Sequence, residues 1–146
     1  MMPVSREKQL AYPHMMPNDI AVWELFLNAY PLRFDRLEYD VHVGVGYGYD
    51  EESPDWHVRL AKGLTQYRID VVGWNSREAT IIEVKPYAGL GTLGQLLGYR
   101  HFFIKDIHVP TLPHLLAVTD QTTADMRDLL REFGIELAEV GFPPSS

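Results

Sequence analysis

Residues 68–85 read RIDVVGWNSREATIIEVK and contain two strand-like apolar runs joined by a short polar turn. Asp70 lies in the first run, and Glu83 and Lys85 lie in the second. Because side chains on a strand alternate between its faces, Glu83 and Lys85 emerge on one face and Val84 points into the opposite, apolar layer. If the runs pair as neighbouring strands, Asp70 joins them at one edge of the sheet. The stretch therefore predicts two carboxylates and an ammonium around a divalent cation, the minimum equipment for metal-assisted hydrolysis of a phosphodiester.

The size and composition of the chain narrow its class. It has 146 residues, 46% of them hydrophobic, which predicts one domain with its own core. There is no cysteine, so a disulfide framework and a thiolate metal site are both excluded. We find no apolar run of about 18 residues and no apolar segment typical of a signal peptide, so we expect a cytoplasmic or virion protein with no membrane partner. The net charge of −7 counts against broad nucleic-acid binding through a basic surface, although a bound cation would change the local balance.

The spacing of apolar residues predicts elements on both sides of the opening stretch. They lie at 19–29 (helix), 36–44, 64–74 and 79–85 (strands), 93–104 (helix), 114–120 (strand), 123–134 (helix) and 135–141 (strand). Residues 1–17 contain three prolines and predict an extended arm, which leaves 18–146 as a single domain. The order α-β-β-β-α-β-α-β predicts the α/β class, with a mixed central sheet flanked by helices.

Some of these segments also predict local detail. Asn18 or Asp19 could cap the first helix, and Thr122 or Thr123 the last. The strand over 36–44 alternates apolar and polar residues and predicts one apolar face, formed by Leu37, Tyr39, Val41 and Val43. The helix over 93–104 offers as core candidates Leu93, Leu96, Leu97, Phe103 and Ile104.

A conjunction of three motifs resembles the PD-(D/E)XK nuclease superfamily. It consists of Asp70, then Glu83-Val84-Lys85, then Gln95 followed four residues later by Tyr99. The Gln-x-x-x-Tyr spacing is similar to that of the RecB-like and phage-exonuclease branch, and the predicted order of elements resembles the restriction-endonuclease-like fold over residues 18–140. The motif E-x-K occurs by chance in many strands, whereas the full conjunction is much rarer.

The resemblance implies a metal-dependent nuclease that hydrolyses the phosphodiesters of DNA. It implies that Asp70, Glu83 and the main-chain carbonyl of Val84 bind one or two Mg²⁺ or Mn²⁺ ions. It also implies that Lys85 orients or helps to deprotonate the attacking water, or stabilises the charge that develops at phosphorus.

The helices would supply the remaining residues of such a site. By the resemblance, Gln95 and Tyr99 would lie over the site and contact the phosphate or position the lysine. The family often adds an acid from its first helix, for which Glu24 is the natural candidate, with Asp19 behind it. Three basic residues could line a phosphate-binding face nearby: Arg68, Arg100 and His101.

The chain departs from the family pattern in one place. The literal Pro-Asp dipeptide is Pro54-Asp55 in an acidic loop, whereas Asp70 follows Ile69. We prefer Asp70 because its segment is strand-like and lies 13 residues before Glu83, a natural spacing for adjacent strands. Turn chemistry accounts for Asp55.

Structural interpretations of these residues stay open at this point. Asp70 could face solvent or pair with Arg68, and Glu83 and Lys85 could form an ordinary solvated strand face. Tyr99 could simply anchor its helix. A solvent-facing glutamate is the corresponding interpretation for the acid of the first helix.

A different class of function also stays open. The fold could be retained in a structural or adaptor subunit of a viral particle or other large assembly, with weak or no catalysis. The net charge, the N-terminal arm and the Gly- and Tyr-rich segment 44–57 favour this alternative. A third possibility is a homodimeric enzyme of Holliday-junction or restriction type. The expected partners are therefore DNA, a second copy of the chain, or assembly proteins.

Overall fold

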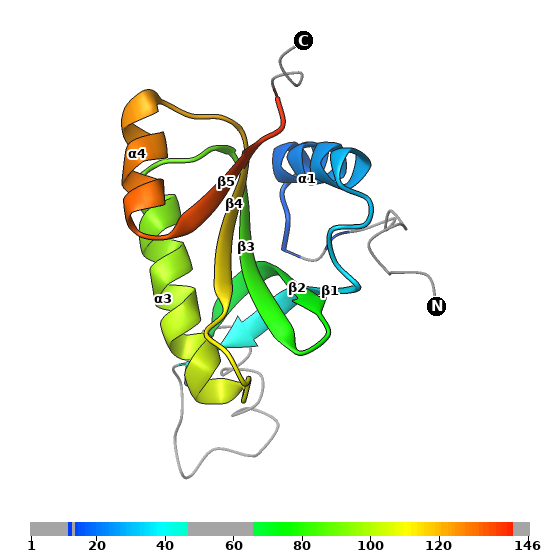
Figure 1. Cartoon of the computed structure of the whole chain (residues 1–146), viewed down its shortest axis with the longest axis vertical. Helices are drawn as coiled ribbons and strands as arrows, with labels where there is room; N and C mark the ends of the chain where they lie inside the picture. The colour runs from blue at the N-terminus through cyan, green and yellow to red at the C-terminus, as the bar shows by residue number, and fades with distance from the viewer. Residues whose placement is uncertain (1–11, 13, 47–65, 142–146) are drawn as a thin grey trace.

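A computed structural model describes residue 12, residues 14–46 and residues 66–141 (Figure 1). The described elements are α1 (Pro17–Ala29), β1 (Arg36–Val43), β2 (Tyr67–Asn75), β3 (Glu78–Tyr87), α3 (Leu90–Asp106), β4 (His114–Gln121), α4 (Ala124–Glu132) and β5 (Ile135–Glu139). The predicted α/β class, with a mixed sheet flanked by helices, is confirmed. No helix in the described part of the chain is long and apolar enough to cross a membrane.

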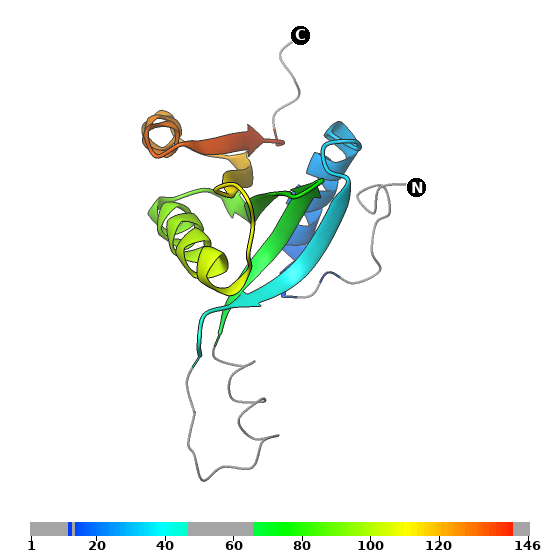
Figure 2. The same ribbon diagram turned by 60° about the horizontal axis from the view of Figure 1, so that its bottom comes forward.

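The five strands form one sheet in the order β1-β2-β3-β4-β5. Neighbours from β1 to β3 are antiparallel, and neighbours from β3 to β5 are parallel. The direction changes at β3 because a short turn leads into it and the α3 crossover leads out of it. Helix α1 covers one face of the sheet, and α3 and α4 cover the other (Figures 1 and 2).

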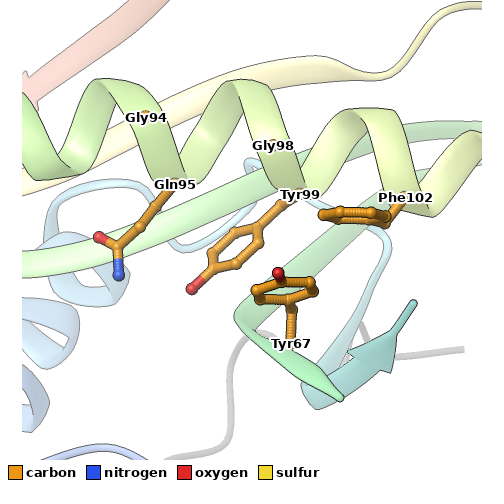
Figure 3. Close-up of a pocket in the computed structure, with 6 residues that line it drawn as sticks. All are labelled: Tyr67, Gly94, Gln95, Gly98, Tyr99 and Phe102. Atoms are coloured by element: carbon orange, nitrogen blue, oxygen red, sulfur yellow. The ribbon is translucent and has the colours of Figure 1, made fainter. Parts of the chain in front are cut away.

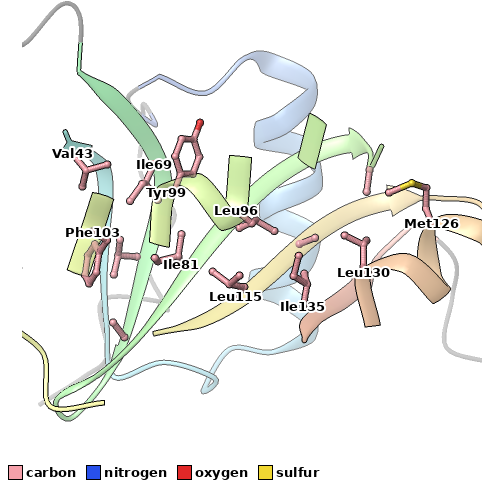
Figure 4. Close-up of a cluster of buried hydrophobic side chains, with 14 residues drawn as sticks. Val43, Ile69, Ile81, Leu96, Tyr99, Phe103, Leu115, Met126, Leu130 and Ile135 are labelled. Atoms are coloured by element: carbon pink, nitrogen blue, oxygen red, sulfur yellow. The ribbon is translucent and has the colours of Figure 1, made fainter. Parts of the chain in front are cut away.

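Each face of the sheet has its own apolar core. The α3–α4 core (Figure 4) includes Ile69, Val72, Ile81, Leu96, Tyr99, Phe103, Leu115 and Leu130. The α1 core includes Tyr12, Met15, Trp23, Phe26, Val71, Ile82, Val84 and Leu116. Val84 thus lies in the layer that strand alternation predicts. Ile104 was predicted to be buried but is 47% exposed, because it follows the buried Phe103 on the turning helix and faces outward.

Strand β1 does not present the single apolar face that its alternation predicts. Leu37 and Tyr39 pack on the α1 core, whereas Val41 and Val43 pack on the α3–α4 core. The change falls at Asp40, whose φ of 55° lies in the left-handed region. A left-handed residue reverses the alternation of the strand, and aspartate tolerates that conformation better than most residues.

The apolar side chains of β2 also change from one face of the sheet to the other, at the position opposite Asp40. Ile69 belongs to the α3–α4 core, but Val71 two residues later belongs to the α1 core. The register pairs Tyr39 with Val71 and Val41 with Ile69, which leaves Asp70 opposite the left-handed residue of β1. Asp70 therefore lies where the sheet switches faces, and this is the position of the candidate site.

The N-termini of α1 and α4 show which residues cap these helices. Helix α1 begins at Pro17, and the Met16 N–H before it donates to Asp19 Oδ2 at 3.4 Å. The prediction that Asn18 or Asp19 is the cap is therefore wrong, because a proline with its fixed φ starts the helix earlier. At α4, Thr123 is the cap, and its hydroxyl accepts from the backbone N–H of residue 126 at 3.3 Å.

Several predictions fall outside the described residues. These are most of the arm (1–11 and 13), the Pro54-Asp55 pair, most of the 44–57 segment and the last five residues (142–146). The division into an arm and one domain therefore stays a prediction. The described end of the arm packs on the α1 core, where the Tyr12 ring lies 5.3 Å from the Tyr39 ring.

Candidate metal centre

The candidate site forms where β2 and β3 stop pairing. Their register runs from Asn75 opposite Glu78 to Val71 opposite Ile82 and goes no further. Beyond that point the Val84 N–H donates to Asp70 Oδ2 at 3.0 Å. The aspartate side chain thus takes the place of a main-chain acceptor. It is 3% exposed and fills the gap between the separating strands.

Glu83 is the most deeply buried carboxyl group of the site. It is 2% exposed, and its Oε2 has no hydrogen-bond partner among the described residues. Burial and the neighbouring negative charge of Asp70 raise the pKa of Glu83 to about 9, against the opposing effect of Lys85. Burial also raises the pKa of Asp70, although the N–H of Val84 counteracts it. Without a bound cation, Glu83 therefore holds a proton at neutral pH.

Lys85 links the sheet carboxylates to the first helix. Its Nζ lies 3.7 Å from Glu83 Oε1 and 3.9 Å from Asp19 Oδ2. The Lys85 side chain is 39% exposed, whereas both carboxylates are nearly buried. The ammonium therefore lies at the mouth of the cluster, that is, at its solvent-accessible side, where it can contact a charged ligand.

Of the two acids that the sequence offers from the first helix, Asp19 lies beside the cluster, 3.9 Å from Lys85 Nζ. The negative charge of Asp19 is among the causes that raise the pKa of both Asp70 and Glu83. Glu24 instead lines a groove of α1 with Pro17, Ile20, Ala21, Leu25 and Asn28. The buried stripe of α1 is Asp19, Val22, Trp23, Phe26 and Leu27. That spacing is readable in the sequence and points to Asp19.

Gln95 and Tyr99 approach the carboxylates from α3, as the family resemblance implies. Burial raises the pKa of Tyr99, and so do the negative charges of Glu83 and Asp70, while a hydrogen bond with Gln95 lowers it. The Tyr99 hydroxyl therefore lies within the electrostatic field of both carboxylates. The structure thus gathers Asp70, Glu83 and Lys85 at the end of the β2–β3 pairing, and Tyr99 of α3, with Gln95 beside it, lies near enough to the two carboxylates to feel their charge.

Among the described residues, the three predicted phosphate-binding residues contact partners other than Asp70 and Glu83. Arg68 makes a bidentate ion pair with Asp40, with both N–O distances at 2.7 Å. Arg100 Nη1 points to the Pro113 carbonyl at 3.5 Å, and His101 is exposed on α3. The phosphate-binding role of these three residues therefore stays a prediction.

A pocket of about 400 Å³ lies beside Gln95 and Tyr99 (Figure 3). Its described lining consists of Tyr67, Gly94, Gln95, Gly98, Tyr99 and Phe102. The rings of Tyr67 and Phe102 stack at 4.7 Å with an angle of 13° between their planes. Sequence reasoning missed this pocket because the stacked rings come from β2 and α3 and no local motif joins them.

The donor set fits a hard divalent cation. It contains only oxygen ligands, which magnesium and manganese prefer, and Glu83 Oε2 is buried with no hydrogen-bond partner within bonding distance among the described residues, although interaction with Asp70 also raises the pKa of Glu83. In the described part of the chain, no three His, Asp or Glu side chains already lie close enough together to hold a metal ion. A cation here would have two protein carboxylates and the Val84 carbonyl as ligands, with waters in the remaining positions, a composition that magnesium accepts.

The described contacts thus join Lys85 to Glu83 on the sheet and to Asp19 on α1, and Tyr99 on α3 lies within the field of the carboxylates. Comparison of the chain with protein-family models, with curated proteins and with solved structures gave no match.

Proposed function

We propose that the protein is a metal-dependent nuclease of the PD-(D/E)XK type, which hydrolyses DNA phosphodiesters with Mg²⁺ or Mn²⁺. The observation that carries the proposal is the buried Asp70–Glu83 pair at a break between two strands, with Lys85 at its mouth. The cluster combines oxygen ligands for a cation with an accessible positive charge for a phosphate.

The energetics of the cluster favour a functional role over a structural one. An unsatisfied buried polar group costs about 1–3 kcal/mol, and breaking a buried ion pair costs more. Glu83 carries such an unsatisfied oxygen inside a sheet whose other buried positions are mostly apolar. An apolar residue of similar volume would fill the same space without this penalty. Perturbed carboxyl pKa values in such clusters are typical of catalytic and metal sites.

The residues divide the chemistry between them. Asp70, Glu83 and the Val84 carbonyl would hold the cation, which supplies a neutralising charge for the phosphate and a lowered pKa for bound water. The Lys85 ammonium, near the surface, attracts and orients the anionic phosphate. The Gln95 amide and Tyr99 hydroxyl fix the substrate from the side of α3 and keep the approach to the carboxylates narrow.

Hydrolysis of linear DNA by the full-length chain tests the proposal. We expect degradation that requires Mg²⁺ or Mn²⁺ and that falls at least about 100-fold in Asp70→Asn, Glu83→Gln and Lys85→Met. Glu24→Gln serves as the matched control, since it changes an acid of the same helix that lines a groove with other residues of α1. If folded wild-type protein leaves DNA intact with either metal at micromolar enzyme, the proposal is wrong.

The second candidate is a nuclease fold used as a structural or adaptor subunit of a large assembly. It is favoured by the net charge of −7 and by the exposed apolar side chains Met16, Leu25 and Leu32 on and beside α1. Recovery of the chain in fixed stoichiometry with particle proteins, together with intact DNA in the assay above, would support this candidate instead.

A further inference from the structure

The aromatic pocket beside α3 contains space that the described residues leave unfilled. Gly94 and Gly98 lie in the interior of α3, where glycine costs up to about 1 kcal/mol relative to alanine. A Cβ built at either glycine would meet no heavy atom of the described residues within 4 Å. Contact with the described residues therefore does not require glycine at these positions. Gly94 and Gly98 lie one helical turn apart, and without side chains they leave this part of the pocket open.

The pocket is aromatic one helical turn beyond Gly98, where Phe102 lies on the same face of α3 as the two glycines. Tyr67 is 49% exposed and stacks almost parallel on Phe102 (Figure 3). The volume of about 400 Å³ lies in the range of small-ligand sites. Stacked, accessible rings of this kind form platforms on which nucleobases stack.

Tyr99 joins the pocket to the carboxylate cluster. Its ring lines the pocket beside the Tyr67–Phe102 stack, and its hydroxyl lies in the field of Asp70 and Glu83. Gln95 also lines the pocket and offers both a hydrogen-bond donor and an acceptor. A ligand in the pocket would therefore contact Tyr99, the residue of the pocket that feels the charge of the two carboxylates.

We propose that this pocket binds an unpaired nucleobase of the DNA strand, which sets the adjacent phosphate against the Asp70–Glu83 carboxylates. The inference rests on the proposed nuclease function and narrows its substrate to single-stranded or frayed DNA ends. A base inside a duplex has both faces covered by its stacked neighbours, so only an unpaired base can offer a face to these rings. Stacking accepts every base, so the pocket selects single-stranded structure rather than sequence.

Binding of labelled oligonucleotides, measured by fluorescence anisotropy, tests the inference separately from catalysis. The probes are a short single strand, the same strand with abasic sites at its end, and a blunt duplex. Calcium replaces magnesium as an oxygen-ligated cation, and a gel confirms that the DNA stays intact. Gly98→Leu fills the pocket, and Gly91→Leu is the matched control, because it also meets no atom within 4 Å but does not line the pocket.

We expect the single strand to bind more tightly than the duplex. Removal of the terminal bases and Gly98→Leu should each weaken single-strand binding about 5- to 100-fold, and Gly91→Leu should leave it unchanged. Phe102→Leu, which removes the stack but keeps an apolar side chain, should weaken it in the same direction. Circular dichroism confirms that each variant is folded, and leucine in place of an interior glycine favours the helix.

Equal binding of intact and abasic strands, or wild-type binding by folded Gly98→Leu, would overturn the inference. The two proposals fail in different ways. Base-dependent binding without magnesium-dependent cleavage would refute the nuclease proposal and keep the pocket assignment. Cleavage at equal rates on blunt duplex and single strand, in wild type and Gly98→Leu alike, would refute the pocket assignment and keep the nuclease.

Discussion

Glu83 is the residue at which burial, protonation and cation binding meet. Its carboxyl group is buried and one of its oxygens lacks a partner, so the pKa rises from its ordinary value of 4.5 to about 9. The folded, metal-free protein therefore holds a proton that the unfolded chain releases at much lower pH. Stability, protonation and cation binding are consequently linked at this residue.

This linkage predicts how stability depends on pH. Between about pH 4.5 and 9 the folded state binds more protons than the unfolded state, so the free energy of unfolding falls as pH rises. The slope contributed by one proton is at most about 1.4 kcal/mol per pH unit. Urea unfolding in EDTA at several pH values measures it. Glu83→Gln should flatten the profile, whereas Glu132→Gln, on the exposed side of α4, should not. Superimposable profiles for wild type and Glu83→Gln would contradict this interpretation.

A second prediction at this scale separates the two acids of α1. Asp19→Asn should lower metal-dependent DNA hydrolysis about 10- to 100-fold, because it removes a charge that lies 3.9 Å from Lys85. Asparagine keeps an acceptor for the Met16 N–H, so the start of the helix should survive. Glu24→Gln should retain wild-type rates. If Glu24→Gln lowered hydrolysis and Asp19→Asn did not, the acid of the first helix would be Glu24, the residue that the family resemblance first favoured.

At the scale of elements, the sequence predicts helices and strands well and their faces less well. Periodicity locates α1, α3 and α4 because apolar spacing reflects burial directly. The reversal of β1 at Asp40 escapes such reasoning, since a left-handed residue leaves no mark on the apolar–polar pattern. The ion-pair partner of Asp40, Arg68, comes from the next strand, a pairing that the sequence does not reveal. The carboxylate site was predictable because its motif residues are closely spaced, whereas the aromatic pocket depends on long-range packing.

Gly73 on β2 illustrates how tightly the elements fit. A Cβ there would come within 2.6 Å of the Phe34 ring, which is itself buried. Gly73→Ala should therefore lower the free energy of unfolding by about 1–3 kcal/mol. Gly91→Ala on α3 meets no neighbour and should raise it by up to about 1 kcal/mol. Urea midpoints of the two variants provide the comparison. A Gly73→Ala protein as stable as wild type would show that the strand and the ring separate easily.

At the scale of the whole molecule, the three layers and the charge act together. The site lies where the sheet changes face, so α1 supplies Asp19 from one side and α3 supplies Gln95 and Tyr99 from the other. The chain carries a net charge of −7, which disfavours contact with DNA away from the site. Attraction would then come from Lys85 and the bound cation, and affinity from the aromatic pocket. In this proposal, attraction of the DNA phosphate and its hydrolysis both depend on binding of the cation.

Calorimetric titration of Mn²⁺ into the metal-free, full-length chain tests that event most directly. We predict saturable binding by the wild type, weakened at least about 10-fold by Glu83→Gln and unchanged by Glu24→Gln. A wild-type protein that binds no Mn²⁺, or that binds it no better than folded Glu83→Gln, would contradict the claim that the gap between β2 and β3 is a metal centre.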